Sequence, residues 1–374
     1  MKPFNKKQAQ LAKILVPFWR TLTLFFASKS HYPVVPSRVL VFDFHLIGDI
    51  VLLTPLLSAL KVSYPKSRVV LVAGHWAENI LLGTGTVDEI VPFSAPWVEY
   101  GQGLRGIFSC FKLVRQLRRC HWDLGIEVRG DVRQIFMLWL AGARRRVGFD
   151  FTGGESLLTD IVYDDGELAH LGEHHKRICS HLGIWENGRR YIPFLELTPD
   201  EKLKASNIPH YIGFHFGASK QLRKFPEHEI VGLLSKFTEA YVSLIVFLPP
   251  NCEHEFDSII GKLPTKVQLK LVLWSGSLRD FIVTASRALH FYCMDSGPAH
   301  IVSALSIPAT VFFGPAESEY VRPLSNNIEV VKKFHVTCRP CDQVICTNEI
   351  HQYCMQGLAS KISTSSLVSL GYQH

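Results

Sequence analysis

The hexapeptide Asp295-Ser296-Gly297-Pro298-Ala299-His300 follows an apolar run at residues 288–293 and precedes a helix-like segment at residues 301–305. This order predicts a strand, a tight turn and a helix start, where free backbone N–H groups can bind a phosphate. Gly297 lets the backbone approach an anion closely, and Asp295, Ser296 and His300 belong to the same turn. The alternative is an ordinary strand-to-helix turn capped by Asp295 or Ser296. The hexapeptide therefore predicts either a diphosphate site or a capped turn.

A second glycine turn lies in the other half of the chain, where Gly48-Asp49 follows a strand-like run at residues 38–44. In an open α/β sheet such a turn faces the crevice in which ligands bind, so Asp49 is a candidate base. The alternative is a carboxylate that the dipole of a helix favours in its first turn.

Strand-like and helix-like segments alternate through residues 37–197 and again through residues 208–358. Alternation of this kind predicts parallel sheets with helices on both faces, so the fold class is α/β with two doubly wound domains. The polar, proline-marked residues 198–209 between them are typical of a linker. Residues 1–36 and 359–374 are left as an N-terminal segment and a C-terminal tail.

Four stretches follow one another in a specific order and spacing. They are Gly48-Asp49 with Leu52-Leu53-Thr54-Pro55-Leu56-Leu57, residues 123–131 with 141–149, Phe214-His215-Phe216-Gly217-Ala218 with Arg223-Lys224-Phe225-Pro226, and the hexapeptide with Phe312-Phe313-Gly314-Pro315. In these stretches residues 37–358 resemble the heptosyltransferase-type glycosyltransferases, family 9 of the GT-B fold. The resemblance implies two Rossmann-like domains facing each other across a cleft and an inverting transfer of a sugar from a nucleotide donor.

The resemblance also implies roles for individual residues. Asp49 matches the catalytic base. The donor-binding positions are matched by Arg223, Lys224, Glu253, Asp295, Ser296, Gly297 and His300. Gly48, Arg129 and Asp131 fall on the acceptor side, although Arg129-Gly130-Asp131 is equally typical of a surface turn with a salt bridge. Two positions depart from the family pattern, since Asp43 stands where arginine is common and Phe225 where tryptophan is common.

The net charge and the absence of several motifs limit the partners and cofactors that the protein can be expected to use. The formal net charge of +7 favours anionic partners such as nucleotide diphosphates, phosphorylated glycolipids or an acidic membrane surface. The basic residues are scattered without a nucleic-acid-binding motif, which argues against a nucleic-acid partner. Because the sequence has no D-x-D, no G-x-G-x-x-G after Phe44 and no P-loop, we expect a metal-independent transferase without a cofactor.

The N-terminal segment combines lysines with apolar residues at helical spacing. Leu11, Ile14, Leu15, Phe18, Leu22, Phe25 and Phe26 form the apolar set. Lys13, Pro17 and Arg20 interrupt the run, which argues against a signal peptide and a transmembrane helix. Two interpretations stay open, a helix packed on the protein itself and an interfacial anchor. We expect a cytoplasmic protein, peripheral at the inner face of a bacterial inner membrane in the second case.

The cysteines divide into two groups. Cys110, Cys120, Cys179, Cys252 and Cys293 are isolated and predict buried thiols of a cytosolic protein. Cys338, Cys341, Cys346 and Cys354 are clustered, and such a set is typical of a structural knuckle, of reduced thiols or of a tetrahedral zinc site.

The sequence thus predicts an inverting glycosyltransferase that transfers a sugar, heptose from ADP-heptose by resemblance, to a lipopolysaccharide core or other glycolipid acceptor. Two alternatives stay open: a GT-B transferase with another nucleotide hexose donor, and an inactive nucleotide-sugar-binding protein.

Overall fold

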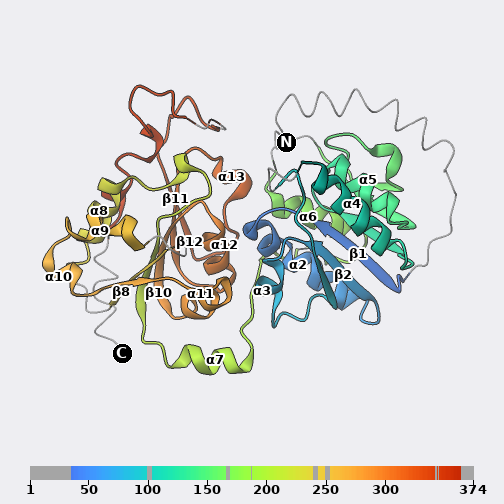
Figure 1. Cartoon of the computed structure of the whole chain (residues 1–374), viewed down its shortest axis with the longest axis horizontal. Coiled ribbons are helices and arrows are strands. Elements are labelled where there is room, and N and C mark those ends of the chain that lie inside the picture. Colours follow the sequence, from blue (N-terminus) through green and yellow to red (C-terminus); the bar gives the residue numbers. More distant parts are fainter. Residues whose placement is uncertain are drawn as a thin grey trace. The chain divides into compact units, whose positions relative to one another are not determined.

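The computed structural model describes residues 35–98, 103–165, 169–186, 188–238, 243–248, 253–341, 343 and 345–363, apart from a few of their side chains. The predictions for residues 1–34 and for the tail beyond residue 363 lie outside the described residues. The chain divides into two compact units, Met1–Tyr191 and Ile192–His374, coloured blue to green and yellow-green to red in Figure 1.

Unit 1 contains a six-stranded sheet with strand order β3-β2-β1-β4-β5-β6, and every paired neighbour is parallel. The strands are β1 (Arg38–Asp43), β2 (Arg68–Ala73), β3 (Glu89–Pro92), β4 (Leu124–Glu127), β5 (Arg145–Gly148) and β6 (Asp160–Ile161). The connecting helices are α2 (Ile47–Ser63), α3 (Ala77–Leu81), α4 (Gly103–Leu117), α5 (Val132–Leu140), α6 (Leu171–His181) and the 3-10 turn η1 (Glu155–Leu157). This strand order is that of a Rossmann sheet.

The central strands of unit 1 are apolar along most of their length because helices cover both faces of the sheet. Leu40 and Phe42 of β1 pack with α4 and α5 in one core cluster, whereas α2 packs against α3 and α6. Alternate residues such as Val39 and Val41 are equally buried, so neither face of β1 meets solvent.

Unit 2 repeats this topology in a six-stranded parallel sheet with strand order β12-β11-β10-β7-β8-β9. The strands are β7 (Tyr211–His215), β8 (Ser243–Phe247), β9 (Leu271–Trp274), β10 (Ala288–Met294), β11 (Ala309–Phe313) and β12 (Ile328–Lys332). The helices and 3-10 turns are α7 (Pro199–Ser206), η2 (Gln221–Arg223), α8 (Glu227–Ser235), η3 (Glu253–Phe256), α9 (Asp257–Ile260), α10 (Thr265–Gln268), α11 (Leu278–Ala285), α12 (Gly297–Ala304), α13 (Ser318–Val321), η4 (Tyr353–Met355) and η5 (Ala359–Lys361). The order read from β7 is again that of a Rossmann sheet.

Residues 353–362, called the C-terminal strap below, complete the core of unit 2. Met355 and Leu358 are fully buried in the cluster that contains strand β7 and helix α8. The Glu229 carboxylate of α8 accepts hydrogen bonds from the backbone N–H groups of Gly357 and Ala359, at 2.6 and 2.7 Å. The strap is therefore fastened by apolar burial and by a charged hydrogen-bond acceptor.

Two local predictions differ from the structure. The turn after β1 is made by residues 44–46, and Gly48 lies inside α2, while Gly297 is the first residue of α12. Neither glycine has a positive φ, so neither turn depends on glycine's conformational freedom. The predicted linker at residues 198–209 contains helix α7, because Thr198 and Glu201 form a capping box and Pro199 suits the first helical turn.

Candidate functional site

Each sheet has one point at which the strand order reverses, and ligands of open α/β sheets bind outside the carboxyl ends of the strands there. In unit 1 this point lies between β1 and β4, and in unit 2 between β7 and β10. Most of the predicted site residues lie in the loops that leave these four strands or in the first turns of the helices that follow.

Asp49 lies in the first turn of α2, close to the end of β1. One carboxylate oxygen, Oδ2, accepts the backbone N–H of Leu46 at 3.0 Å, and Oδ1 pairs with Nη1 of Arg129 at 3.0 Å. The side chains of Asp49 and Arg129 keep 19% and 13% of their surface exposed. Asp49 is thus an oriented carboxylate that a substrate hydroxyl can still reach.

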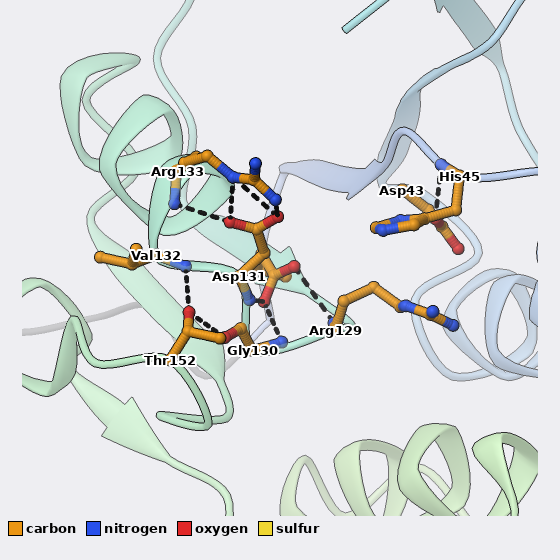
Figure 2. Close-up of polar contacts among 9 residues, drawn as sticks. Asp43, His45, Arg129, Gly130, Asp131, Val132, Arg133 and Thr152 are labelled. Atoms are coloured by element: carbon orange, nitrogen blue, oxygen red, sulfur yellow. Dashed lines mark hydrogen bonds and ion pairs between the residues drawn. The ribbon is translucent and has the colours of Figure 1, made fainter. Parts of the chain in front are cut away.

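Arg129 is held by the loop that follows β4, and a buried carboxylate shapes that loop. Glu127 is fully buried and accepts backbone N–H groups from Arg129 and Gly130, at 3.1 and 2.6 Å. Burial, together with the nearby Asp131 carboxylate, raises the pKa of Glu127 well above its ordinary value. Figure 2 shows the Arg129 side chain extending away from Asp131 and towards the side of Asp43 and His45.

The Asp131 side chain stabilises the local structure at the start of helix α5. It caps helix α5 by accepting the backbone N–H of Arg133 at 2.9 Å, and both of its carboxylate oxygens bind the Arg133 guanidinium (Figure 2). The Asp131 side chain is buried, and its low exposure does not support the predicted role on the acceptor side. Gly130 has φ +68° and a Cβ there would lie 2.6 Å from the Phe151 ring, so the turn requires glycine.

Asp43, the departure from the family pattern, is fully buried at the end of β1. Its Oδ1 faces Nδ1 of His45 at 3.1 Å. Burial acts to raise the pKa of Asp43, but the hydrogen bond with His45 and the positive charge of Arg129 bring it below its ordinary value. Arg129 therefore lies in the field of two carboxylates, Asp43 and Asp49.

In unit 2 the corresponding ion pair joins Arg223 of η2 to Asp295 at the end of β10, with 3.0 Å between Nη1 and Oδ2. Asp295 is buried, and burial raises its pKa, whereas the charges of Arg223 and Lys220 act to lower it. A buried carboxylate repels a diphosphate, so Asp295 suits the orientation of Arg223 better than a direct contact with the donor.

The start of α12 has the geometry of an anion site. Ser296 is the extended N-cap residue, and its Oγ donates to the Met294 carbonyl instead of capping the helix. The N–H of Gly297 has no acceptor within the helix and can bind a ligand, whereas Pro298 has no N–H and the Ala299 N–H donates to the Ser296 carbonyl at 3.1 Å. His300 is buried one turn further on.

Two other predicted donor-binding residues, Lys224 and Glu253, have no described side-chain contact with this site. Lys224 follows Arg223 and is partly exposed, and Glu253 begins η3, where its side chain is not among those described.

Two residues near the site were not predicted. Lys220 is one of them, although its charge acts on Asp295; the run of cations after β7 could have indicated it. Glu127 was missed as a site residue, although an acidic residue at a strand end was a usable signal.

The four clustered cysteines line one small cavity of about 20 Å³ between the residues after β12 and the C-terminal strap. Each of Cys338, Cys341, Cys346 and Cys354 is a free thiol. Within the described ranges, no three His, Cys, Asp or Glu side chains are arranged to hold a metal ion. Of the isolated cysteines, Cys179 and Cys293 are buried as predicted, Cys110 and Cys120 are partly exposed, and Cys252 is outside the described residues.

Two Rossmann-like units, each with an arginine–aspartate pair at the reversal point of its sheet, define a protein of the GT-B class. The structure of the Escherichia coli ADP-heptose lipopolysaccharide heptosyltransferase II has the same fold, with a TM-score of 0.68, 19% identity, and coverage of 88% of this chain and 96% of that one. The chain belongs to glycosyltransferase family 9 (heptosyltransferase), whose model matches residues 110–351.

Curated relatives agree with this assignment. Lipopolysaccharide heptosyltransferase 2 of Escherichia coli K12 is 21% identical over 310 residues, which cover 79% of this chain and 88% of the relative. Lipooligosaccharide heptosyltransferase 2 of Haemophilus ducreyi is 22% identical over 313 residues, with the same two coverages. The protein is thus a glycosyltransferase by family. Within the described part of the chain, no helix has the length and apolarity that crossing a membrane requires.

Proposed function

We propose that this glycosyltransferase transfers heptose from ADP-heptose to a lipopolysaccharide core acceptor with inversion at the anomeric carbon. The names of the relatives support the donor sugar and the acceptor class. The observation that carries the proposal is Asp49, a partly exposed carboxylate at the reversal point of unit 1, oriented by Arg129 and by the Leu46 N–H.

In the proposed reaction, Asp49 takes the proton of an acceptor hydroxyl as the oxygen attacks the anomeric carbon. The attack comes from the face opposite the departing nucleoside diphosphate, which gives inversion. Arg129 acts as a positioning residue, because its guanidinium fixes one carboxylate oxygen at 3.0 Å.

The leaving diphosphate gains negative charge as the glycosidic bond breaks. Arg223 and Lys220 supply positive charge beside Asp295 at the α12 N-terminus, Lys224 adds a further cation to the donor site in the proposal, and the Gly297 N–H donates to a phosphate oxygen. Ser296, Gly297 and His300 complete this donor site in the proposal, Asp295 holds Arg223, and Glu253 contacts the nucleoside. Gly48 and Arg129 lie on the acceptor side.

We propose a cytoplasmic enzyme, peripheral at the inner face of the bacterial inner membrane, where a glycolipid acceptor would be reached. The net charge of +7 supports attraction to an anionic surface.

The test of the base is Asp49→Asn, which keeps the size of the side chain and an oxygen that can accept the Leu46 N–H. We expect kcat for ADP-heptose and a truncated lipopolysaccharide acceptor to fall at least about 100-fold, because proton transfer is lost. Asp200→Asn, at an exposed carboxylate in the first turn of α7, is the matched control. Turnover of Asp49→Asn within a few-fold of the control would refute the role of Asp49, and transfer from other nucleotide sugars alone would refute the donor.

Metal independence has its own test, since in this proposal side chains and the Gly297 N–H stabilise the charge of the diphosphate. Transfer by the wild-type enzyme should continue unchanged in EDTA. An activity that disappears in EDTA and returns with Mg²⁺ or Mn²⁺ would contradict the proposed charge stabilisation.

A further inference from the structure

Helix α4 of unit 1 has one face in the core and one face in solvent. Its buried residues Leu113, Val114 and Leu117 pack with strands β1 and β2. On its outward side, Ile107, Phe108 and Phe111 keep 52%, 72% and 62% of their surface exposed. An outward aromatic pair is unusual for a helix whose inner face already fills the core.

These apolar residues form a single patch. Phe108 and Phe111 are three residues apart and Ile107 and Phe111 are four apart, so all three lie on neighbouring positions of one helix face. Contiguous exposed apolar groups of this kind mark interaction sites more often than scattered ones do.

Positive charge continues the patch along the helix. Lys112, Arg115, Arg118 and Arg119 are all exposed, and residues 103–120 contain no acidic residue. Among the residues that the structure describes, none of these four side chains forms an ion pair. The helix dipole favours cations at the C-terminal end but gives no reason for the aromatic residues at the other end.

A hollow of about 490 Å³ lies beside this face. It is lined by three apolar residues, Phe111, Val114 and Leu140, and by three arginines, Arg115, Arg118 and Arg119. A hollow that is half apolar and half cationic fits a ligand with an anionic head and an apolar body.

We propose that this α4 face, formed by Ile107, Phe108, Phe111 and the four cations, docks unit 1 on an anionic phospholipid surface. The aromatic side chains enter the boundary between head groups and acyl chains, and the arginines bind lipid phosphates. An acidic protein surface would satisfy the cations, but it would leave the exposed aromatic rings without an apolar partner. The proposal rests on the peripheral membrane location proposed above, and it is independent of the transferred sugar and of Asp49 as the base.

The test measures co-sedimentation of the full chain with phosphatidylglycerol–phosphatidylethanolamine vesicles and with phosphatidylcholine vesicles. Phe108→Ser combined with Phe111→Ser should weaken binding to the anionic vesicles at least about tenfold, since apolar area no longer enters the bilayer. Phe108→Leu with Phe111→Leu should retain most of the binding. Replacing Arg115, Arg118 and Arg119 by Gln should weaken binding roughly fivefold per arginine and reduce its salt dependence.

Matched controls carry the same changes on other surfaces. Leu203→Ser with Leu269→Ser removes two apolar side chains that are 68% and 82% exposed in unit 2. Replacing the exposed Lys66, Lys202 and Lys204 by Gln removes the same charge as the triple arginine variant. Both controls should bind vesicles as the wild type does, apart from a small general charge effect.

Three outcomes would overturn the proposal. The α4 variants could bind vesicles like their controls, or the wild type could bind phosphatidylcholine as strongly as phosphatidylglycerol. The serine variant could also lower the melting temperature while vesicle binding stays unchanged, which would mean that another part of the chain covers this face. Transfer to a soluble acceptor fragment checks the fold of each variant, and it should match the wild type.

Discussion

Buried ionisable side chains surround the reversal point of unit 1. Asp43 and Glu127 are fully buried carboxylates, and His175 is a fully buried imidazole whose Nδ1 lies 3.2 Å from the Leu52 carbonyl. Burial lowers the pKa of His175 from 6.5 to about 4, so the ring is neutral at pH 7. These groups give unit 1 a stability that depends on pH.

His175→Gln should flatten that dependence. Below pH 6.5 the unfolded chain binds a proton at His175 that the folded chain binds only near pH 4, so stability falls as the pH falls through this window. The wild type should lose up to about 3 kcal/mol more than the variant between pH 7 and pH 4, measured by urea unfolding. The exposed His121, changed to Gln, is the control. Equal pH slopes for wild type and His175→Gln would show that the ring is not held neutral.

At the residue scale, two predicted site residues lie at the reversal points of the two sheets. The strand-then-glycine pattern indicated Asp49, and the family resemblance implied Arg223. Their ion-pair partners, Arg129 and Asp295, come from strands far away in sequence, and no local pattern contains that pairing. Arg145 and Arg146 likewise bind partners inside unit 1, namely Asp160 and the Leu157 carbonyl.

Strands could be predicted where burial on both faces requires apolar residues. The strand-like runs at residues 69–72, 124–128 and 309–313 predict strands and agree with β2, β4 and β11 to within two residues, because a parallel strand covered on both faces is mostly apolar. The short strands β5 and β6 were not predicted, since Arg145, Arg146 and Asp160 make them look polar. Arg145 of β5 forms an ion pair with Asp160 of the neighbouring edge strand β6, and the composition of either strand alone does not reveal this pair.

Helix α7 lies within the predicted linker, and its charged contacts explain why it is stable. Glu201 accepts the Thr198 N–H and two N–H groups of Arg279 in α11, at 2.6 and 2.7 Å for the guanidinium. The hydrogen bonds from Arg279 lower the pKa of Glu201 from 4.5 to about 2. A Thr-x-x-Glu sequence before a helix was the signal to weigh against the polar composition.

Glu201→Gln should destabilise unit 2 by about 2 kcal/mol at pH 7, because a charged acceptor of Arg279 is lost. The stabilisation is complete above about pH 4.5 and disappears as the pH falls through about 2, so the gap between variant and wild type should narrow with acid. Thermal melts at pH 7 and pH 3 measure this gap. Glu227→Gln, in the exposed pair with Lys262, should change little at either pH, and a similar loss in that variant would mean that any carboxylate change has this effect.

At the scale of the whole molecule, the two units share a topology, but the acidic and basic partners of their ion pairs follow opposite strands. In unit 1 the carboxylate of the ion pair follows the first strand and the guanidinium follows the fourth, and in unit 2 the order is reversed. Unit 1 therefore has an accessible carboxylate on the first turn of a helix, as a base needs. Unit 2 has a guanidinium beside a helix N-terminus, as an anion site needs, and a buried carboxylate that orients this guanidinium.

Each unit has its own core, so damage to one should stay local. Leu358→Ala removes a fully buried side chain of the C-terminal strap and should cost unit 2 about 2–5 kcal/mol. Hydrogen exchange should accelerate in β7, β10 and α8 and stay unchanged in β1, β2 and α2. Leu269→Ala, at a site 82% exposed, serves as the control. Faster exchange in both units would mean that they unfold together.

The C-terminal strap also sets an order of events during synthesis. The synthesis of unit 1 is complete once residue 191 is made, but the core of unit 2 waits for Met355, Leu358 and Ile362. At a typical translation speed, the roughly 170 residues in between take on the order of 10–30 s. During that interval the nascent chain of unit 2 exposes the aromatic face of Phe214 and Phe312 that the strap will help to cover. Chaperones that bind unfinished chains should therefore meet this protein late in its synthesis, on its second half.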